Sequence, residues 1–215
     1  MRALRGFAWV LLSGALLLPA EPVLGQTRMS VVAGAARSGV SGADTEGAGY
    51  SGRTGIYLNV AAELPLWRFL SVLPGGSYLD RGYNFNEDNY RLKLPYVEIS
   101  APLRVSVPLG GTLGLHVFGG PGFALAFGCN FIQEQGNVQS SFTCEPGDFL
   151  IRSWDVTGIL GGGLSVAIAG STRLLLQGAL NNSLITVDNG DPRADVKHRS
   201  LLITAGASFP LQNRR

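Results

Sequence analysis

The feature that most constrains this chain is a strict alternation of apolar and polar residues. In LPYVEISAPLRVSV, residues 94–107, every second residue from Val97 is apolar, and the residues between them include Glu98 and Arg104. Neighbouring side chains on a strand point to opposite faces. The period of two therefore predicts an extended strand with one face that avoids water and one face that carries charge.

The same alternation recurs along the chain and predicts eight strands. We expect them near residues 28–37, 53–64, 68–80, 90–107, 112–128, 152–169, 172–186 and 198–209. The connections alternate between short turns, such as PLGG and AGST, and long polar segments, such as RGYNFNEDN and VDNGDPRADVK. In an up-and-down arrangement all short turns then fall at one end and all long loops at the other, as in exported transmembrane barrels.

The composition of the two faces predicts which one points inward. The apolar face carries Leu, Ile, Val and Phe, whereas the other face mixes charged residues with Gly, Ala and Ser. An eight-stranded barrel has a narrow interior, so the small and charged face fits inside and the aliphatic face meets lipid. A closed barrel also leaves no backbone edge unsatisfied in hydrocarbon. The sequence therefore predicts an all-β, eight-stranded antiparallel up-and-down transmembrane β-barrel in the outer membrane of a Gram-negative-type cell.

The N-terminus predicts export. MRALR is a short basic segment, and GFAWVLLSGALLLPA has the length of the apolar region of a signal peptide. We expect residues 1–25 to be a cleaved signal peptide and residues 26–215 to be the barrel domain; the alternative is an uncleaved membrane anchor. An exported chain with two cysteines, Cys129 and Cys144, is expected to hold them in a disulfide.

Charge and motifs argue against several function classes. The net charge is only +2 and no Lys/Arg run occurs, so no nucleic-acid partner is expected. The only histidines are His116 and His198, and no motif surrounds them. A lipid hydrolase or protease built on His198 is the alternative, but we predict no enzyme activity, no cofactor and no metal site. DNGDPRAD, residues 188–195, lacks the spacing of a calcium loop.

Five charged residues fall on the predicted inward face: Glu63, Glu98, Arg104, Asp155 and Arg173. They could line an ion path or supply catalytic carboxylates. The interpretation we favour is a lumen charge network that plugs the barrel, because an unpaired charge in such a place is costly. Aromatic residues near the predicted strand ends, Trp67, Tyr83, Tyr90, Tyr96, Phe149 and Trp154, suggest interfacial girdles.

The stretch LPYVEISAPLRVSVPLGGTLGLHVFGGPGFALAFG resembles the central hairpin of the outer-membrane β-barrel domain family that includes PorT-like proteins. Tyr96, Glu98, Pro102 and Arg104 are similar in kind to the family's strand pattern, although Pro102 sits later than the family's proline. GIYLNVAAELPL is similar to the family's second strand. The chain departs from the family at Gln177, Ala179 and Leu180, and at PLQNRR after Phe209. The resemblance implies location and architecture rather than an activity.

These observations predict a small integral outer-membrane protein with a structural, adhesive or partner-binding role through its long outer loops. Its expected partners are outer-membrane lipid, the barrel-assembly machinery during insertion, and an extracellular or envelope protein that contacts the loops. Two alternatives stay open: a secreted or periplasmic lipocalin-like barrel that binds an apolar ligand inside, and a narrow ion-conducting barrel.

Overall fold

The computed structural model describes residues 26–45, 49–85, 89–135, 138–144, 152–169, 171–188, 190 and 194–211. The predicted signal peptide, residues 1–25, and Phe149 lie outside the described residues. No helix in the described part of the chain has the length and hydropathy needed to cross a membrane.

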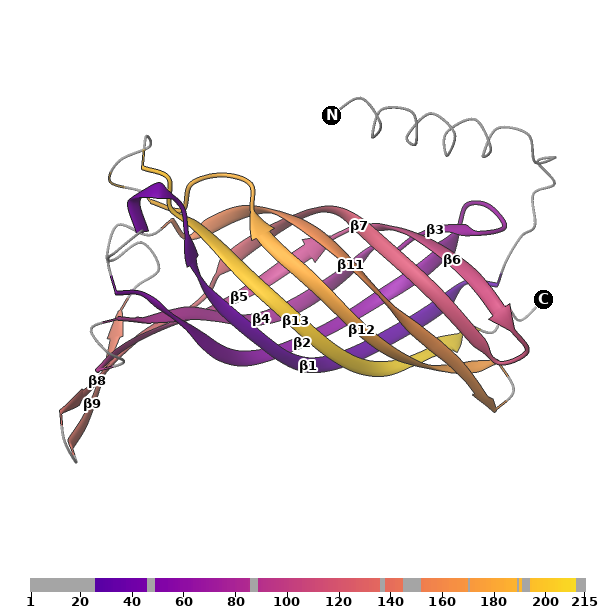
Figure 1. The fold of residues 1–215 in the computed structure, drawn as a ribbon, viewed down its shortest axis with the longest axis horizontal. Helices are drawn as coiled ribbons and strands as arrows, with labels where there is room; N and C mark the ends of the chain where they lie inside the picture. The colour runs from indigo at the N-terminus through magenta and orange to yellow at the C-terminus, as the bar shows by residue number, and fades with distance from the viewer. Residues whose placement is uncertain are drawn as a thin grey trace, which may run out of the picture.

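The described chain is built from antiparallel strands (Figure 1). They are β1 (Arg28–Ser41), β2 (Ser51–Pro65), β3 (Leu70–Val72), β4 (Gly75–Phe85), β5 (Tyr90–Ser100), β6 (Leu103–Gly110), β7 (Leu113–Ala126), β8 (Cys129–Gln135), β9 (Val138–Cys144), β11 (Trp154–Ala169), β12 (Thr172–Ser183) and β13 (Lys197–Pro210), with a short 3-10 helix η1 (Ala43–Thr45) after β1.

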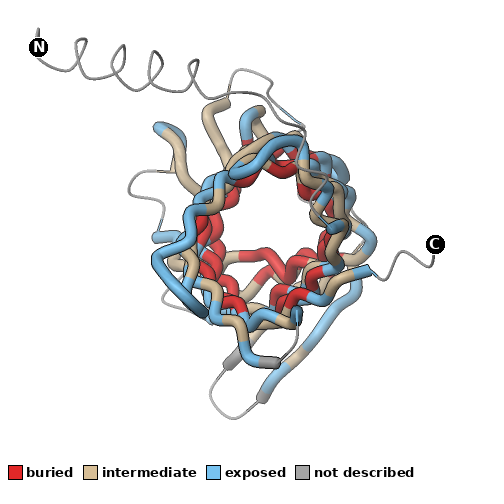
Figure 2. The backbone as a smooth tube through the Cα atoms, turned by 90° about the vertical axis from the view of Figure 1, so that its right-hand side faces the viewer, coloured by how far each residue is buried: buried red, intermediate tan, exposed pale blue. Residues whose placement is uncertain are grey.

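The strand pairings close into a ring. β1 pairs with both β13 and β2, and β7 pairs with both β11 and β5. Since β12 joins β11 to β13 and β4 joins β2 to β5, the ring runs β1–β13–β12–β11–β7–β5–β4–β2 and back to β1. Figure 2 shows this closed outline along the barrel axis. Closure satisfies the backbone groups that an open sheet would leave unpaired at its edges.

The sequence predicted eight continuous strands, whereas the described residues form twelve. Two predicted strands are interrupted by prolines, which cannot donate to the ladder. At the short-turn end β3 takes the place of β4 beside β2, and β6 takes the place of β5 beside β7. The break between β3 and β4 is at Pro74, and the break between β5 and β6 is at Pro102. Backbone hydrogen bonds span both breaks, from Leu73 N to Pro102 O and from Ala62 N to Pro74 O, each of 2.9 Å.

The remaining difference is an additional hairpin. The cysteine-bearing segment was predicted to be a long loop, but it forms β8 and β9, which pair with each other and extend beyond the ring (Figure 1). β8 also continues the ladder of β5 from Tyr90 to Lys93. The segment escaped the sequence pattern because polar residues such as Asn130, Gln133 and Ser140 occupy both faces.

Short and long connections lie at opposite ends, as the sequence predicts. The turns after β2 and β6 and the end of β11 are at the right of Figure 1, with the start of β1 and the end of β13. The strand ends that the long connections join, and the β8–β9 hairpin, are at the left. The turn after β6 uses Gly110 and Gly111, whose φ angles are +118° and +35°. Both lie in the left-handed region that glycine adopts without strain.

The aliphatic face points outward and the polar face inward. Val97 and Ile99 are 49% and 65% exposed, whereas Glu98 between them is 1% exposed. Figure 2 shows the same alternation around the whole ring. The lipocalin-like alternative required the large aliphatic side chains to point inward and is therefore wrong. A continuous apolar outer surface of this extent is unfavourable in water and suits a hydrocarbon surrounding.

The interior is more apolar than the sequence interpretation allowed. Val32, Tyr57, Leu79, Leu175 and Leu202 point inward and form a buried cluster across the barrel. The sequence interpretation characterised the inward face by charged residues and by Gly, Ala and Ser. It missed Leu175, because the run of three leucines at 174–176 does not reveal that the middle one points inward. This cluster separates two groups of charged side chains.

Candidate functional site

The deepest group of charged side chains is centred on Arg81 of β4, which is fully buried. Its guanidinium donates to Asp155 Oδ2 at 2.7 Å and to Glu98 Oε2 at 3.3 Å. It also donates to Asn181 Oδ1 at 2.7 Å. Glu98 lies on the neighbouring β5, whereas Asp155 and Asn181 lie on β11 and β12, so the guanidinium crosses the interior and links β4 to strands that are not its neighbours in the ring. We call Arg81, Glu98, Asp155 and Asn181 the central cluster.

Neutral donors add further hydrogen bonds to the carboxyl groups of the central cluster. The Asn181 amide donates to both Glu98 oxygens at 3.1 and 3.0 Å, and the Thr157 hydroxyl donates to Glu98 Oε2 at 3.1 Å. The Ser183 hydroxyl donates to Asp155 Oδ2 at 2.7 Å. One guanidinium thus serves two buried carboxyl groups, and removal of Arg81 would leave both of them without a cation.

Aromatic rings enclose the central cluster. The Arg81 guanidinium lies 4.9 Å from the centre of the Tyr96 ring, and the His198 ring lies 5.8 Å from Tyr96. Both Tyr96 and His198 are buried, and the backbone N–H of His198 donates to Ser183 Oγ at 3.0 Å. Gly122 leaves room for the side chains of Thr157 and Glu98, since a Cβ at this position would lie 2.5 Å from Thr157 Oγ1 and 3.0 Å from Glu98 Oε1.

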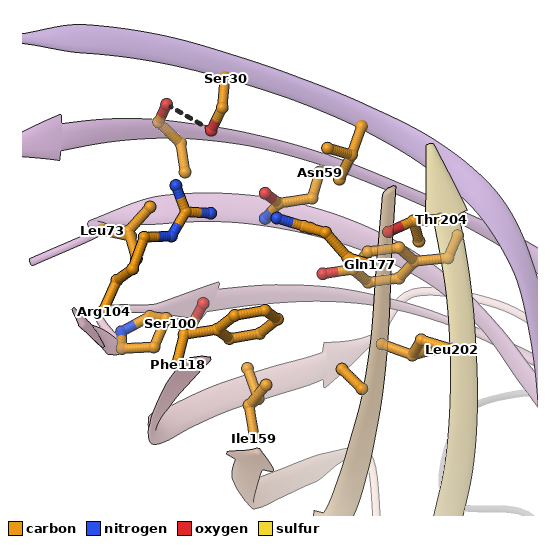
Figure 3. Close-up of a pocket in the computed structure, with 15 residues that line it drawn as sticks. Ser30, Asn59, Leu73, Ser100, Arg104, Phe118, Ile159, Gln177, Leu202 and Thr204 are labelled. Carbon is orange, nitrogen blue, oxygen red and sulfur yellow. Dashed lines mark hydrogen bonds between the residues drawn. The ribbon is translucent and has the colours of Figure 1, made fainter. Parts of the chain in front are cut away.

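A second ion pair lies nearer the short-turn end. Arg104 Nη1 donates to Glu63 Oε2 at 3.4 Å, and the Ser71 hydroxyl donates to Glu63 Oε1 at 3.3 Å. Arg104 also lines a cavity of about 50 Å³ together with Asn59 and Gln177 (Figure 3). A space of that size holds a few water molecules at most and is far smaller than the roughly 300 Å³ of a small-molecule site.

The structure divides the five predicted lumen residues. Glu98 and Asp155 meet in the central cluster, and Glu63 pairs with Arg104. Arg173, at the start of β12, is exposed and lies outside both groups. Sequence reasoning missed Arg81, which joins the two carboxylates, because RGYNFNEDN was taken as a loop. The signal was present: the inward positions Ser77, Leu79 and Arg81 continue the period of two into that segment.

The two histidines occupy the barrel interior. His116 is buried with its Nε2 3.1 Å from Gln177 Nε2, and His198 packs on Tyr96 as described above. In the described residues no group of three or more His, Cys, Asp or Glu side chains is arranged to hold a metal ion. The absence of catalysis stays a prediction.

The long-loop end carries a second candidate surface, which we call the rim. It comprises the β8–β9 hairpin and five aromatic side chains at its base: Tyr50, Tyr83, Phe85, Tyr90 and Phe131. Their ring centres are 5.1 Å apart for Tyr50 and Tyr83, 5.2 Å for Phe85 and Tyr90, and 5.7 Å for Tyr90 and Phe131. Cys129 and Cys144 close the base of the hairpin with a disulfide, as predicted.

All three predicted girdle tyrosines face the interior or the rim. Tyr96 is buried, and Tyr83 and Tyr90 belong to the aromatic group at the rim. Trp67 and Trp154 are exposed on the outer surface as expected. Proximity to a strand end does not reveal whether a side chain points inward or outward. That direction depends on the alternation along each strand that also turns Glu98 and Arg81 inward.

Two long connections at this end are tied together. The backbone N–H of Asp195 donates to Asp44 Oδ2 at 2.6 Å, and the backbone N–H of Ala43 donates to Asp195 Oδ2 at 3.3 Å. Lys197 pairs with Asp195 Oδ1 at 2.8 Å. The Lys197 ammonium and the Ala43 amide hold the pKa of the Asp195 carboxyl below its usual value.

Comparison with known proteins gives a consistent result. A family model described as outer membrane protein beta-barrel domain matches residues 25–189. Among solved structures, the chain is similar to Neisserial surface protein A, with 14% identity over 85% of this chain and 97% of that chain and a TM-score of 0.50. It is also similar to the attachment invasion locus protein Ail of Yersinia pestis, with 16% identity, coverage of 86% and 100%, and a TM-score of 0.44. No protein of curated function matches.

Proposed function

The chain belongs to the family of outer membrane protein β-barrel domains and is located in the outer membrane, and from this premise we propose that it is an eight-stranded transmembrane anchor that presents its rim to a protein partner outside the cell. The ring of eight strands crosses the membrane with its aliphatic face in lipid. The long connections and the β8–β9 hairpin then lie on the outer side.

The filled interior supports an anchoring role. Two groups of ion pairs and an apolar cluster occupy the barrel between its ends. Interior hydrogen bonds join strands on opposite sides of the ring, as between Arg81 and Asn181. Such cross-links stiffen a barrel and leave little space for a diffusing solute.

The observation that carries the proposal is the β8–β9 hairpin. It rises past the ring, and the strand order ends at β9, so that in the described residues β9 has a neighbour on one side only. An edge strand of this kind can pair with an added strand from a partner. Phe142 on β9 is 58% exposed, and the aromatic group at the base adds the side chains that protein interfaces favour.

Site-specific photo-crosslinking in intact producing cells tests this proposal. A photoreactive phenylalanine analogue replaces Phe142 or Tyr50 at the rim. The control positions are Ile203, on the lipid face, and Phe209, at the opposite end of the barrel. We expect a discrete protein adduct from the rim positions and none from the controls.

A second variant removes the hairpin while the barrel stays intact. A short Gly-Ser turn replaces residues 130–143, with Cys129→Ser and Cys144→Ser, and the analogue remains at Tyr50. Loss of the Tyr50 adduct, with an unchanged mobility shift between unboiled and boiled samples in SDS, supports the hairpin as the contact. Absence of any adduct from both rim positions, or its persistence without the hairpin, overturns the proposal.

The partners for insertion and the finer family assignment remain predictions. We expect the barrel-assembly machinery to insert the chain after removal of residues 1–25. The resemblance to PorT-like proteins within the broader family also stays a prediction.

A further inference from the structure

A row of cationic side chains runs along the outer surface near the long-loop end. We call Arg199 of β13, Arg37 of β1, Arg53 of β2, and Arg91 and Lys93 of β5 the cationic row. Strand register sets the level of Arg199, opposite Gly39, and of Arg91, opposite Asn84 of the intervening β4. Arg53 joins them through its ion pair with Asp80, which Lys93 also contacts. Arg199 and Arg37 are exposed, and the others are half-buried.

The row marks the upper boundary of the apolar band. On β13 the outward positions run from Ile203 and Leu201 to Arg199. On β1 they run from Met29 and Val31 to Arg37, and on β5 from Val97 to Lys93 and Arg91. The change from aliphatic to cationic residues thus occurs at a similar level on neighbouring strands. In a membrane this level is the junction of hydrocarbon and headgroups.

The opposite side of the barrel ends its apolar band differently. There Phe123 of β7 stacks on Trp154 of β11 with ring centres 6.3 Å apart, and the Arg152 guanidinium lies 5.5 Å from the centre of the Trp154 ring. Aromatic side chains at both interfaces are the ordinary arrangement of a membrane barrel. Positive charge at this level is therefore concentrated on one side of the barrel, where five cationic side chains line β13, β1, β2 and β5.

Within the row, three guanidinium-bearing residues line one hollow of about 500 Å³: Arg37, Arg53 and Arg91. Ser51, Thr54 and Asn84 complete its wall and add hydroxyl and amide groups. Arg37 leans across β2, since its Nε would lie 3.4 Å from a Cβ at Gly52. Several guanidinium groups with neutral donors around one concavity are the arrangement that recognises a phosphate.

A single carboxylate organises this surface. Asp80 accepts two hydrogen bonds from Arg53, each of 3.0 Å, and its Oδ2 lies 3.7 Å from Lys93 Nζ. On the outward strand faces that the structure describes around the row, Asp80 is the one acidic side chain. It fixes the direction of Arg53, while Arg37 brings a second guanidinium to the same hollow, so the hollow favours an added anion.

We propose that this hollow binds the phosphate group of a lipid headgroup in the outer leaflet of the membrane. The hollow lies directly above the aliphatic faces of β1, β2 and β5, so the acyl chains of the same lipid would lie along the apolar band. The proposal rests on the membrane orientation given under the proposed function, but it does not depend on any protein partner.

Lipid retention by the purified mature chain tests this proposal. The folded protein is extracted from phosphatidylcholine nanodiscs that contain diphosphoryl lipid A, and native mass spectrometry counts the glycolipid that stays bound. The test variant is Arg37→Ala/Arg91→Ala, which leaves the Arg53–Asp80 pair intact. The matched control is Arg68→Ala/Arg173→Ala, which removes two arginines at the short-turn end. We expect about a tenfold or greater loss of retained lipid in the test variant only.

Further arms separate the possible outcomes. Dephosphorylated lipid A should be retained less than the diphosphoryl form and equally by the native chain and the test variant, and inorganic phosphate should not displace the bound glycolipid. Equal retention by both double variants, or equal retention of the dephosphorylated lipid, overturns the proposal. Displacement by inorganic phosphate overturns the assignment to a lipid. The photo-crosslinked adduct at the rim requires a protein partner, whereas lipid retention is measured on the purified chain alone. Either proposal can therefore fail while the other holds.

Discussion

At the scale of single residues, Arg81 determines whether the interior is stable. It is fully buried and contacts Glu98, Asp155 and Asn181. Replacement by methionine keeps most of the volume but leaves two buried carboxyl groups without a cation. We expect Arg81→Met to lower the free energy of unfolding by about 3–5 kcal/mol. Urea titration in phosphatidylcholine vesicles, followed through Trp67 and Trp154 fluorescence, measures the loss.

Two further variants distinguish a specific effect from a general one. Arg173→Met changes an exposed arginine and should alter the free energy of unfolding by less than about 0.5 kcal/mol. Arg81→Met/Glu98→Gln/Asp155→Asn removes cation and carboxylates together and should recover part of the loss, because no buried charge then lacks a partner. Equal stability of Arg81→Met and the native chain would show that the central cluster is not a structural bridge.

At the scale of elements, the β8–β9 hairpin is stabilised separately from the ring. Its ladder pairs β8 with β9 and reaches the ring through Tyr90–Lys93 of β5. Cys129 and Cys144 are directly opposite each other, 15 residues apart in sequence, and close the hairpin at its base. A constraint of that length contributes about 3 kcal/mol against opening of the loop.

We therefore expect Cys129→Ser/Cys144→Ser to loosen the hairpin and leave the barrel unchanged. Proteinase K should cleave within the hairpin up to about a hundredfold faster, the rate equivalent of 3 kcal/mol. The heat-dependent mobility shift in SDS reports the ring and should stay the same. Loss of that shift would mean that the disulfide stabilises the whole barrel. Unaltered cleavage would mean that it does not stabilise the hairpin.

The alternation of Val97, Glu98 and Ile99 was enough to predict strands, their facing and the closed architecture, since lipid selects one face of every strand. It could not locate the breaks at Pro74 and Pro102, because neighbouring backbone hydrogen bonds carry the ladder past each proline. Nor could it find the β8–β9 hairpin, which lies beyond the apolar band, where no lipid imposes the pattern. The period of two could have placed Arg81 inward, but not its partners, because these contacts cross the ring and no single strand contains them.

At the scale of the whole molecule, the outer apolar band has two kinds of border, and the interior side chains form successive layers along the barrel. Outside, an aliphatic band ends in aromatic rings over β7 and β11 and in the cationic row over β13, β1, β2 and β5. Inside, the aromatic and aliphatic group around Leu92 and Tyr96 is followed by the central cluster, the apolar cluster around Leu79, and the Arg104–Glu63 pair. The outer pattern sets contact with lipid, and the layers inside set permeability.

The layered interior predicts a barrel that does not conduct. An ion would have to displace the Arg81 guanidinium from its carboxylates and then cross a buried apolar cluster, and both steps are costly. In planar lipid bilayers we expect no steady conductance steps from the native chain. Arg81→Ala/Glu98→Ala/Leu79→Ala removes large side chains from both the central cluster and the apolar cluster and should produce detectable current.

The matched control for conductance is Glu63→Ala/Arg104→Ala, which opens only the layer near the short-turn end. It should remain as silent as the native chain, because the central cluster still fills the barrel above it. Discrete steps from the native chain that change with Glu98→Gln would instead support a narrow ion path. The ion pairs that hold the strands together would then also select the permeating ion, and the barrel would be a channel as well as an anchor.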